Sequence, residues 1–115
     1  MDLYKDLIGV KYKDNGRSKE EGYDCYGLAI EVLRRNGKVL EDRISNPSEC
    51  KITTGDKLDK PENLCLVLFR NRKDIYHHLA IYIGNGLIIH TDSKQVCIEP
   101  LAKFNAKHKE FYRVH

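Results

Sequence analysis

The sequence lacks any long apolar stretch. Its 115 residues carry a formal net charge of +3. The first residues, which include Asp2, Lys5 and Asp6, form neither a signal peptide nor a membrane-spanning segment. We therefore expect no membrane insertion, and a protein that is made in the cytoplasm and leaves, if exported, by another route. A chain of this length predicts one domain over residues 1–115.

Runs of like charge and metal-binding spacings are also missing. Lys and Arg are scattered among Asp and Glu, so nucleic acid is not an expected partner. Zinc sites usually show Cys-x-x-Cys or His-x₃₋₅-His spacing, whereas His77 and His78 are adjacent and no cysteine has such a neighbour, so neither a metal nor a cofactor is predicted. Without a secretion signal we expect reduced thiols, with Cys65 and Cys97 in the core. The chain has four cysteines: Cys25, Cys50, Cys65 and Cys97.

The clearest helical period begins at Cys25. Apolar residues at positions 25, 28, 29, 32 and 33 predict a helix that runs to about Asn36 with one buried face, and Asp24 is a suitable N-cap. The N–H groups and dipole of a helix N-terminus stabilise a thiolate, which lowers the pKa of cysteine from about 8.5 towards about 3.5–7.5. Cys25 is therefore a candidate nucleophile. The alternative is that it simply packs in the core.

The remaining segments predict a small antiparallel sheet. Residues 2–12 predict a short amphipathic helix, and residues 38–63 predict a long surface excursion. With helices early and a strand meander late, the fold class is α+β. Strands are predicted over residues 64–69, 78–83, 87–91, 95–98 and 111–114.

The glycine-rich turn at 84–86 decides which face His90 takes. A two-residue loop would turn His90 away from His78. A three-residue loop would place Ile83 opposite Leu87 and make the two histidines diagonal neighbours, about 7–8 Å apart at Cα. Glycine at the left-handed position favours the three-residue loop. We therefore expect the two imidazoles to share a face, the one nearest the helix N-terminus.

Several motifs follow one another in an order typical of one family. They are Gly9, Tyr12, Asp-Cys-Tyr-Gly-Leu at 24–28, His-Leu-Ala-Ile-Tyr-Ile-Gly-Asn-Gly at 78–86, and Ile-His at 89–90. Together they resemble the NlpC-type cell-wall peptidases of the papain-like superfamily, over nearly the whole chain. The resemblance implies a papain-like NlpC-type fold, with the nucleophile helix packed on a mostly antiparallel sheet. Tyr26, where many secreted members have serine, resembles the phage tail-assembly branch.

The resemblance also implies roles for individual residues. The nucleophile, the base, the group that orients the base, and a hydroxyl beside the oxyanion would be Cys25, His78, His90 and Tyr12, respectively. Three alternatives remain open. His77 could be the base, although strand alternation puts it on the opposite face. Asp92 could replace His90 as the orienting group, and Tyr12 could merely pack.

The activity implied is that of a cysteine endopeptidase. It would hydrolyse amide bonds in peptidoglycan stem peptides, typically beside D-glutamate, through a thioester acyl-enzyme. Because the chain shows no export signal and no wall-binding module, we expect a phage or prophage tail-associated protein, with peptidoglycan peptides and other tail proteins as partners. One alternative is a non-catalytic structural component of the tail. Another is an amidase, deamidase or acyltransferase that uses the same cysteine and histidine chemistry.

Overall fold

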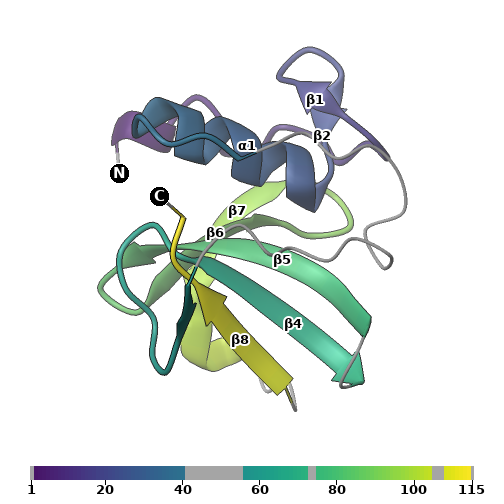
Figure 1. Ribbon diagram of the computed structural model, residues 1–115. Helices are drawn as coiled ribbons and strands as arrows, with labels where there is room; N and C mark the ends of the chain where they lie inside the picture. Colours follow the sequence, from purple (N-terminus) through teal and green to yellow (C-terminus); the bar gives the residue numbers. More distant parts are fainter. Residues whose placement is uncertain (1, 41–55, 73–74, 105–107, 115) are drawn as a thin grey trace.

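The computed structural model describes residues 2–40, 56–72, 75–104 and 108–114. One helix packs over a curved antiparallel sheet (Figure 1), so the predicted α+β class is confirmed. The elements in chain order are η1 (Asp2–Tyr4), β1 (Arg17–Ser18), β2 (Gly22–Tyr23), α1 (Cys25–Arg35), β3 (Lys57–Leu58), β4 (Leu66–Arg72), β5 (Ile75–Gly84), β6 (Leu87–Thr91), β7 (Val96–Pro100), η3 (Leu101–Lys103) and β8 (His108–Tyr112).

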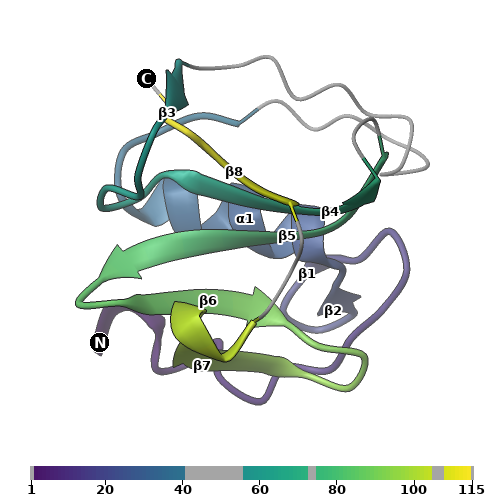
Figure 2. The same cartoon turned by 90° about the horizontal axis from the view of Figure 1, so that it is seen from below.

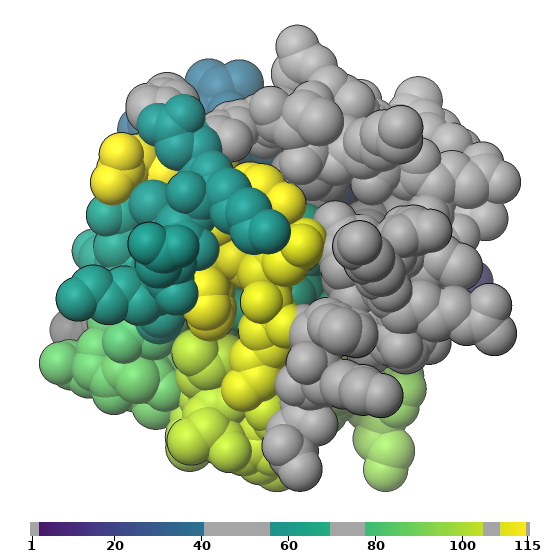
Figure 3. All heavy atoms as spheres, turned by 60° about the horizontal axis from the view of Figure 1, so that its bottom comes forward, coloured from purple at the N-terminus to yellow at the C-terminus, as the bar shows by residue number. Residues whose placement is uncertain are grey.

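The main sheet has six strands in the order β3-β8-β4-β5-β6-β7. Strands β4 to β7 follow one another as a meander, and β8 returns to pair with β4 (Figure 2). Strand β3 adds to the outer edge through β8, and Figure 3 shows this part of the chain beside the C-terminal strand. The meander agrees with the predicted strands. By contrast, β8 begins three residues earlier than expected, and β3 lies in the segment predicted as a surface excursion.

The N-terminal segment differs from the predicted helix. Only Asp2–Tyr4 is helical, as a single 3₁₀ turn. Gly9 has a φ of +88°, a left-handed conformation that ends helical geometry. The chain then runs alongside β7, where Gly9 N–H donates to the Val96 carbonyl and Val10 accepts from Val96 N–H. Backbone pairing to the sheet therefore replaces the local helix, which is how tertiary contacts commonly override a weak local pattern.

Helix α1 follows the prediction closely. Asp24 caps it, with Oδ1 accepting from Gly27 N–H at 2.6 Å. The helix ends at Arg35, and Gly37 has a left-handed φ of +76° just beyond it. Its buried side chains, among them Leu28, Val32 and Leu33, pack on the sheet. Among the residues described, no helix combines the length and apolar character needed to cross a membrane.

Each face of the sheet carries its own apolar cluster. Alternate residues of β4, β5 and β6, such as Leu68, Leu79 and Ile89, face α1 and form the larger core. The residues between them, such as Val67, Phe69 and Ile88, form a second cluster on the opposite face. Because side chains alternate along a strand, consecutive residues of β5, such as Leu79 and Ala80, belong to different clusters.

The β5–β6 turn differs in detail from the prediction. Gly84 pairs with Leu87 across a two-residue loop at 85–86. Both loop residues have positive φ, as a type I′ turn requires. The register then shifts, so that Tyr82 pairs with Ile88 and one residue of β5 is left over as a β-bulge. The three-residue loop was therefore wrong, but the bulge restores the register that it predicted.

Candidate active site

Cys25 stands at the first position of α1 and is partly buried. It opens onto a cavity of about 300 Å³ at the junction of the helix start, the N-terminal loop and the β6–β7 connection. The cavity therefore brings together residues from four separate parts of the sequence. Its walls are formed by Tyr12, Cys25, His78, Thr91, Asp92 and Ser93.

Asp24 connects the loop that precedes α1 to the start of the helix through hydrogen bonds. Besides capping α1, its carboxylate accepts from Arg17 Nη1 at 2.9 Å and from Asn15 N–H at 3.1 Å. Gly27 lies directly against this loop, since a Cβ at that position would be 2.1 Å from the Gly16 carbonyl oxygen. Glycine two residues after the cysteine is thus required by packing, and this packing fixes where Cys25 points.

The electrostatics of Cys25 correct one prediction. Burial, followed by the negative charge of Asp24, raises the pKa of this thiol to about 11. Backbone N–H groups of Leu79, Tyr26 and Cys25 itself act in the expected direction and lower the pKa, but they do not outweigh burial. The raised pKa favours the thiol form, so a nucleophilic Cys25 would need a nearby base to take its proton.

His78 and His90 meet as the register predicts. His78 Nε2 and His90 Nδ1 are 2.7 Å apart, a hydrogen-bond distance. The two residues lie on the face that carries the second cluster. There the His78 ring stacks on the Phe69 ring with 5.6 Å between ring centroids, and the His90 ring meets the Phe104 ring edge-on with 5.2 Å between centroids. We expected the sheet face nearest the helix N-terminus. His78 does line the cavity at that end of α1, but both rings lie on the face opposite the helix, since Leu79 occupies the face that packs on α1.

The site forms where the sheet opens. Among the described residues, the pairing recorded between β5 and β6 ends with Ile81 opposite Ile89. Beyond this pair, His78 lines the same cavity as Cys25 although the two approach from opposite sides of the sheet. Because Nε2 of His78 is engaged by His90, a base role towards Cys25 would use the other ring nitrogen, Nδ1.

His90 is almost fully buried, with 3% of its surface exposed. Burial lowers its pKa, while the carboxylates of Glu99 and Asp92 oppose this shift. Its Nε2 lies 3.8 Å from Glu99 Oε2 and 3.5 Å from Cys97 Sγ. A carboxylate can only accept, so Glu99 favours the proton on Nε2 and leaves Nδ1 as an acceptor towards His78. This tautomer keeps Nδ1 of His78 unprotonated, as a base requires.

Sequence reasoning missed Glu99 and misplaced Cys97. Cys97 was expected in the core, but it is partly exposed and its thiol donates to Glu99 Oε1 at 3.5 Å. Burial and the Glu99 charge raise the pKa of Cys97 to about 11. Both residues could have been found by register, because His90 pairs with Cys97 across the β6–β7 hairpin, and Glu99 follows on the same face of β7.

Tyr12 and Asp92 line the cavity, and their side chains bond to residues of their own loops. The Tyr12 hydroxyl donates to Asp14 at 2.7 Å, and this bond raises the pKa of Tyr12 to about 12. Asp92 Oδ1 accepts from the N–H groups of Lys94 and Gln95 and shapes the turn, while His90 is at hydrogen-bond distance from His78. The side chain of His77 and the whole of Cys50 lie outside the described part of the chain.

Fold and site together define a class of protein. An α+β chain that presents a helix-opening cysteine and a coupled histidine pair to one cavity has the groups of a thiol-dependent acyl-transfer enzyme. The chain belongs to the NlpC/P60 family, whose model matches residues 9–113. The resemblance found in the sequence is therefore confirmed at the level of the family.

Three known proteins illustrate the relationship. The chain is 34% identical over 101 residues to Gamma-DL-glutamyl hydrolase of Bacillus subtilis (strain 168), covering 82% of this chain and 23% of that protein. It is 31% identical over 101 residues to Murein DD-endopeptidase MepS/Murein LD-carboxypeptidase of Escherichia coli (strain K12), covering 81% and 48%. The crystal structure of an NlpC/P60 family protein from Bacillus cereus ATCC 10987 superposes with a TM-score of 0.70 at 27% identity, covering 93% and 36%. The chain thus spans less than half the length of the two curated relatives.

Proposed function

We propose that this protein is a cysteine peptidase that hydrolyses amide bonds in peptidoglycan stem peptides. The observation that carries the proposal is the shared cavity of Cys25 and His78, with His90 held 2.7 Å from the second ring nitrogen of His78. Membership of the NlpC/P60 family supports the same chemistry. The names of the relatives, a γ-glutamyl hydrolase and a murein endopeptidase, support the substrate class.

The first half of the reaction forms a thioester. Nδ1 of His78 takes the Cys25 proton, and the thiolate adds to the amide carbonyl. Backbone N–H groups at the start of α1, that of Cys25 among them, bind the oxyanion. His78, now an imidazolium whose Nε2–H donates to His90, gives the proton to the leaving amine. The carbon–nitrogen bond breaks, and the acyl group remains on sulfur.

The second half restores the enzyme. His78 accepts a proton from a water molecule while the water oxygen adds to the thioester carbonyl. Collapse of this intermediate expels the Cys25 thiolate, releases a carboxylic acid and returns the proton from His78 to sulfur. Throughout, Glu99 and His90 hold the tautomer of His78, so both act as positioning residues.

The finer assignment concerns the bond and the setting. A linkage beside D-glutamate is supported by the names of the glutamyl-specific relatives. Association with a phage or prophage tail rests on the aromatic Tyr26 after the cysteine, which resembles the tail-assembly branch of the family. In this setting the protein is made in the cytoplasm and reaches the cell wall as part of the tail.

The test is digestion of purified peptidoglycan by the full chain, with Cys25→Ala as the control and mass spectrometry of the released peptides. Hydrolysis predicts paired new amino and carboxyl ends that are absent from the control. Fragments that carry the acyl group on an added amine would indicate an acyltransferase instead. An unchanged wall, with folded protein bound to it, would favour the non-catalytic structural component and overturn the proposal.

A further inference from the structure

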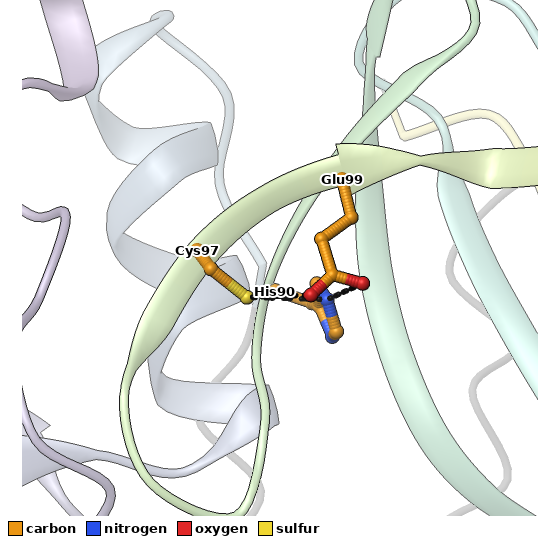
Figure 4. A group of neighbouring side chains, drawn as sticks. All are labelled: His90, Cys97 and Glu99. Carbon is orange, nitrogen blue, oxygen red and sulfur yellow. Dashed lines mark hydrogen bonds and ion pairs between the residues drawn. The ribbon is translucent and has the colours of Figure 1, made fainter. Parts of the chain in front are cut away.

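Three metal-ligating side chains converge on the side of His90 remote from His78. His90 comes from β6, while Cys97 and Glu99 come from β7, and Figure 4 shows the sulfur, imidazole and carboxylate pointing towards one another. The sulfur lies 3.5 Å from His90 Nε2 and 3.5 Å from Glu99 Oε1, and Nε2 lies 3.8 Å from Glu99 Oε2. One imidazole in this cluster is almost fully buried, so the site is built into the fold.

These separations match the edges of a tetrahedral metal site. With metal–sulfur bonds of about 2.3 Å and metal–nitrogen or metal–oxygen bonds of about 2.0–2.2 Å, neighbouring ligand atoms stand about 3.3–3.7 Å apart. The sulfur–nitrogen distance of 3.5 Å falls in this range. Glu99 approaches the other two atoms through different oxygens, Oε1 at 3.5 Å from the sulfur and Oε2 at 3.8 Å from Nε2, so its carboxylate must turn to offer one oxygen to the metal. A cation at the centre would have three protein ligands and one open position for water.

The surrounding charges also favour a dication. Glu99 carries a negative charge, and Asp92 Oδ2 adds another at 4.0 Å from the Cys97 sulfur. Lys103 opposes a cation, because its Nζ lies 3.0 Å from Glu99 Oε2. The Lys103 side chain is 62% exposed, however, and can turn to solvent when a metal takes that oxygen. Sulfur and imidazole together select zinc-like ions over magnesium or calcium.

We propose that Cys97, His90 and Glu99 bind a divalent zinc-like cation, and that this cation switches off His78 as a base. Binding displaces the thiol proton of Cys97 to solvent and forms a metal–sulfur bond. The binding half of the proposal stands on the geometry of the cluster. The switching half rests on the proposed function.

The switch follows from the tautomers of the two imidazoles. A metal on Nε2 of His90 forces its remaining proton onto Nδ1. That N–H then donates to Nε2 of His78, only 2.7 Å away. A neutral His78 must consequently carry its own proton on Nδ1, the nitrogen needed to accept the Cys25 proton. The bound form therefore has the nucleophile and the base in place but no acceptor for the thiol proton.

Binding is tested with Co²⁺ on the full-length Cys25→Ala protein, in which the active-site thiol cannot ligate. We expect a thiolate-to-cobalt charge-transfer band that saturates at one Co²⁺ per chain. The band should vanish when Cys97→Ala is added and persist when Cys65→Ala, a buried thiol elsewhere in the fold, is added instead. If Cys97→Ala proves unstable, the near-isosteric Cys97→Ser repeats the test. Absence of the band, or its survival without Cys97, would overturn the site.

Switching is tested on the active protein with Zn²⁺. Relative to its own metal-free rate, Cys97→Ala should need at least about tenfold more Zn²⁺ for half-inhibition than wild type, as expected for the loss of one ligand. Cys65→Ala should behave as wild type. Equal inhibition of wild type and Cys97→Ala would place the inhibitory ion at Cys25 and refute the switch. If metal-free wild type hydrolyses no cell wall, the proposed function fails while the cobalt result still decides the site.

Discussion

Gly27→Ala should damage both the stability and the activity of this protein. The added methyl group would lie 2.1 Å from the Gly16 carbonyl oxygen, more than 1 Å short of ordinary contact. That oxygen belongs to the backbone, and Gly16 is itself closely packed, because a Cβ built on it would lie 2.2 Å from the Gly22 carbonyl oxygen. The loop must therefore move as a unit.

The size of the effect follows from three contributions. Forcing a methyl group into a packed site costs about 1–3 kcal/mol. Moving the loop also strains the bonds of Asn15 and Arg17 to the Asp24 cap, and loss of a cap costs about 0.5–2 kcal/mol. Replacing a helical glycine by alanine returns about 1 kcal/mol. We expect a net loss of about 2 kcal/mol, which lowers the melting temperature by about 5–10 °C at this chain length.

Thermal unfolding and wall hydrolysis measure the two consequences. The matched control is Gly37→Ala, where nothing lies within 4 Å of the added atom but φ is +76°. This control should lose about 1 kcal/mol from its left-handed backbone and keep its activity. Gly27→Ala should lose activity by an order of magnitude or more even well below its melting temperature, since Cys25 is displaced. A variant with wild-type stability and turnover would refute the packing argument.

Three further predictions concern the chemistry. Cys25→Ala and His78→Ala should each reduce turnover by roughly 10⁴–10⁶, and the double variant should be little worse, because the effects of substitutions within one catalytic unit do not add. Single-turnover kinetics of all three variants would show additive losses if this reasoning is wrong. The raised pKa of Cys25, about 11, predicts that the rate of its alkylation by iodoacetamide rises about tenfold per pH unit from pH 7 to 10. The rate is measured by peptide mass spectrometry, and a rate that is already constant at pH 7 would indicate a preformed thiolate. Glu99→Gln should lower kcat by about tenfold with little change in KM, because a neutral amide fixes the His90 tautomer less firmly, and a selective rise in KM would point to substrate contact instead.

Local sequence patterns were sufficient for the elements that carry the site. The period of α1 and the cap at Asp24 are local properties, and they locate Cys25 at the start of a helix. The meeting of His78 and His90 was also predictable, because register depends on alternation and turn chemistry. The predicted register is correct although the predicted loop is wrong, because a bulge next to Gly84 shifts the pairing by one residue, as a third loop residue would have done.

Properties that depend on the sum of many contacts were not predictable in this way. The helix N-terminus does favour a Cys25 thiolate, but the opposing burial is set by β5 and the N-terminal loop, which lie far away in sequence. Cys97 lies in an apolar run that predicts a core position, but it pairs with His90 on the neighbouring strand and belongs to a polar cluster. The pattern of residues 2–12 does not indicate that their backbone forms hydrogen bonds with β7.

The proposed nucleophile and the proposed base are held by different cores. Cys25 depends on the cluster between α1 and the sheet, whereas the His78 and His90 rings rest on Phe69 and Phe104 on the opposite face. The two halves meet only where pairing between β5 and β6 has ended. A change on the far face can therefore alter the base without moving the thiol. This division explains how the proposed metal cluster of β6 and β7 would act on the reaction through the histidine tautomers.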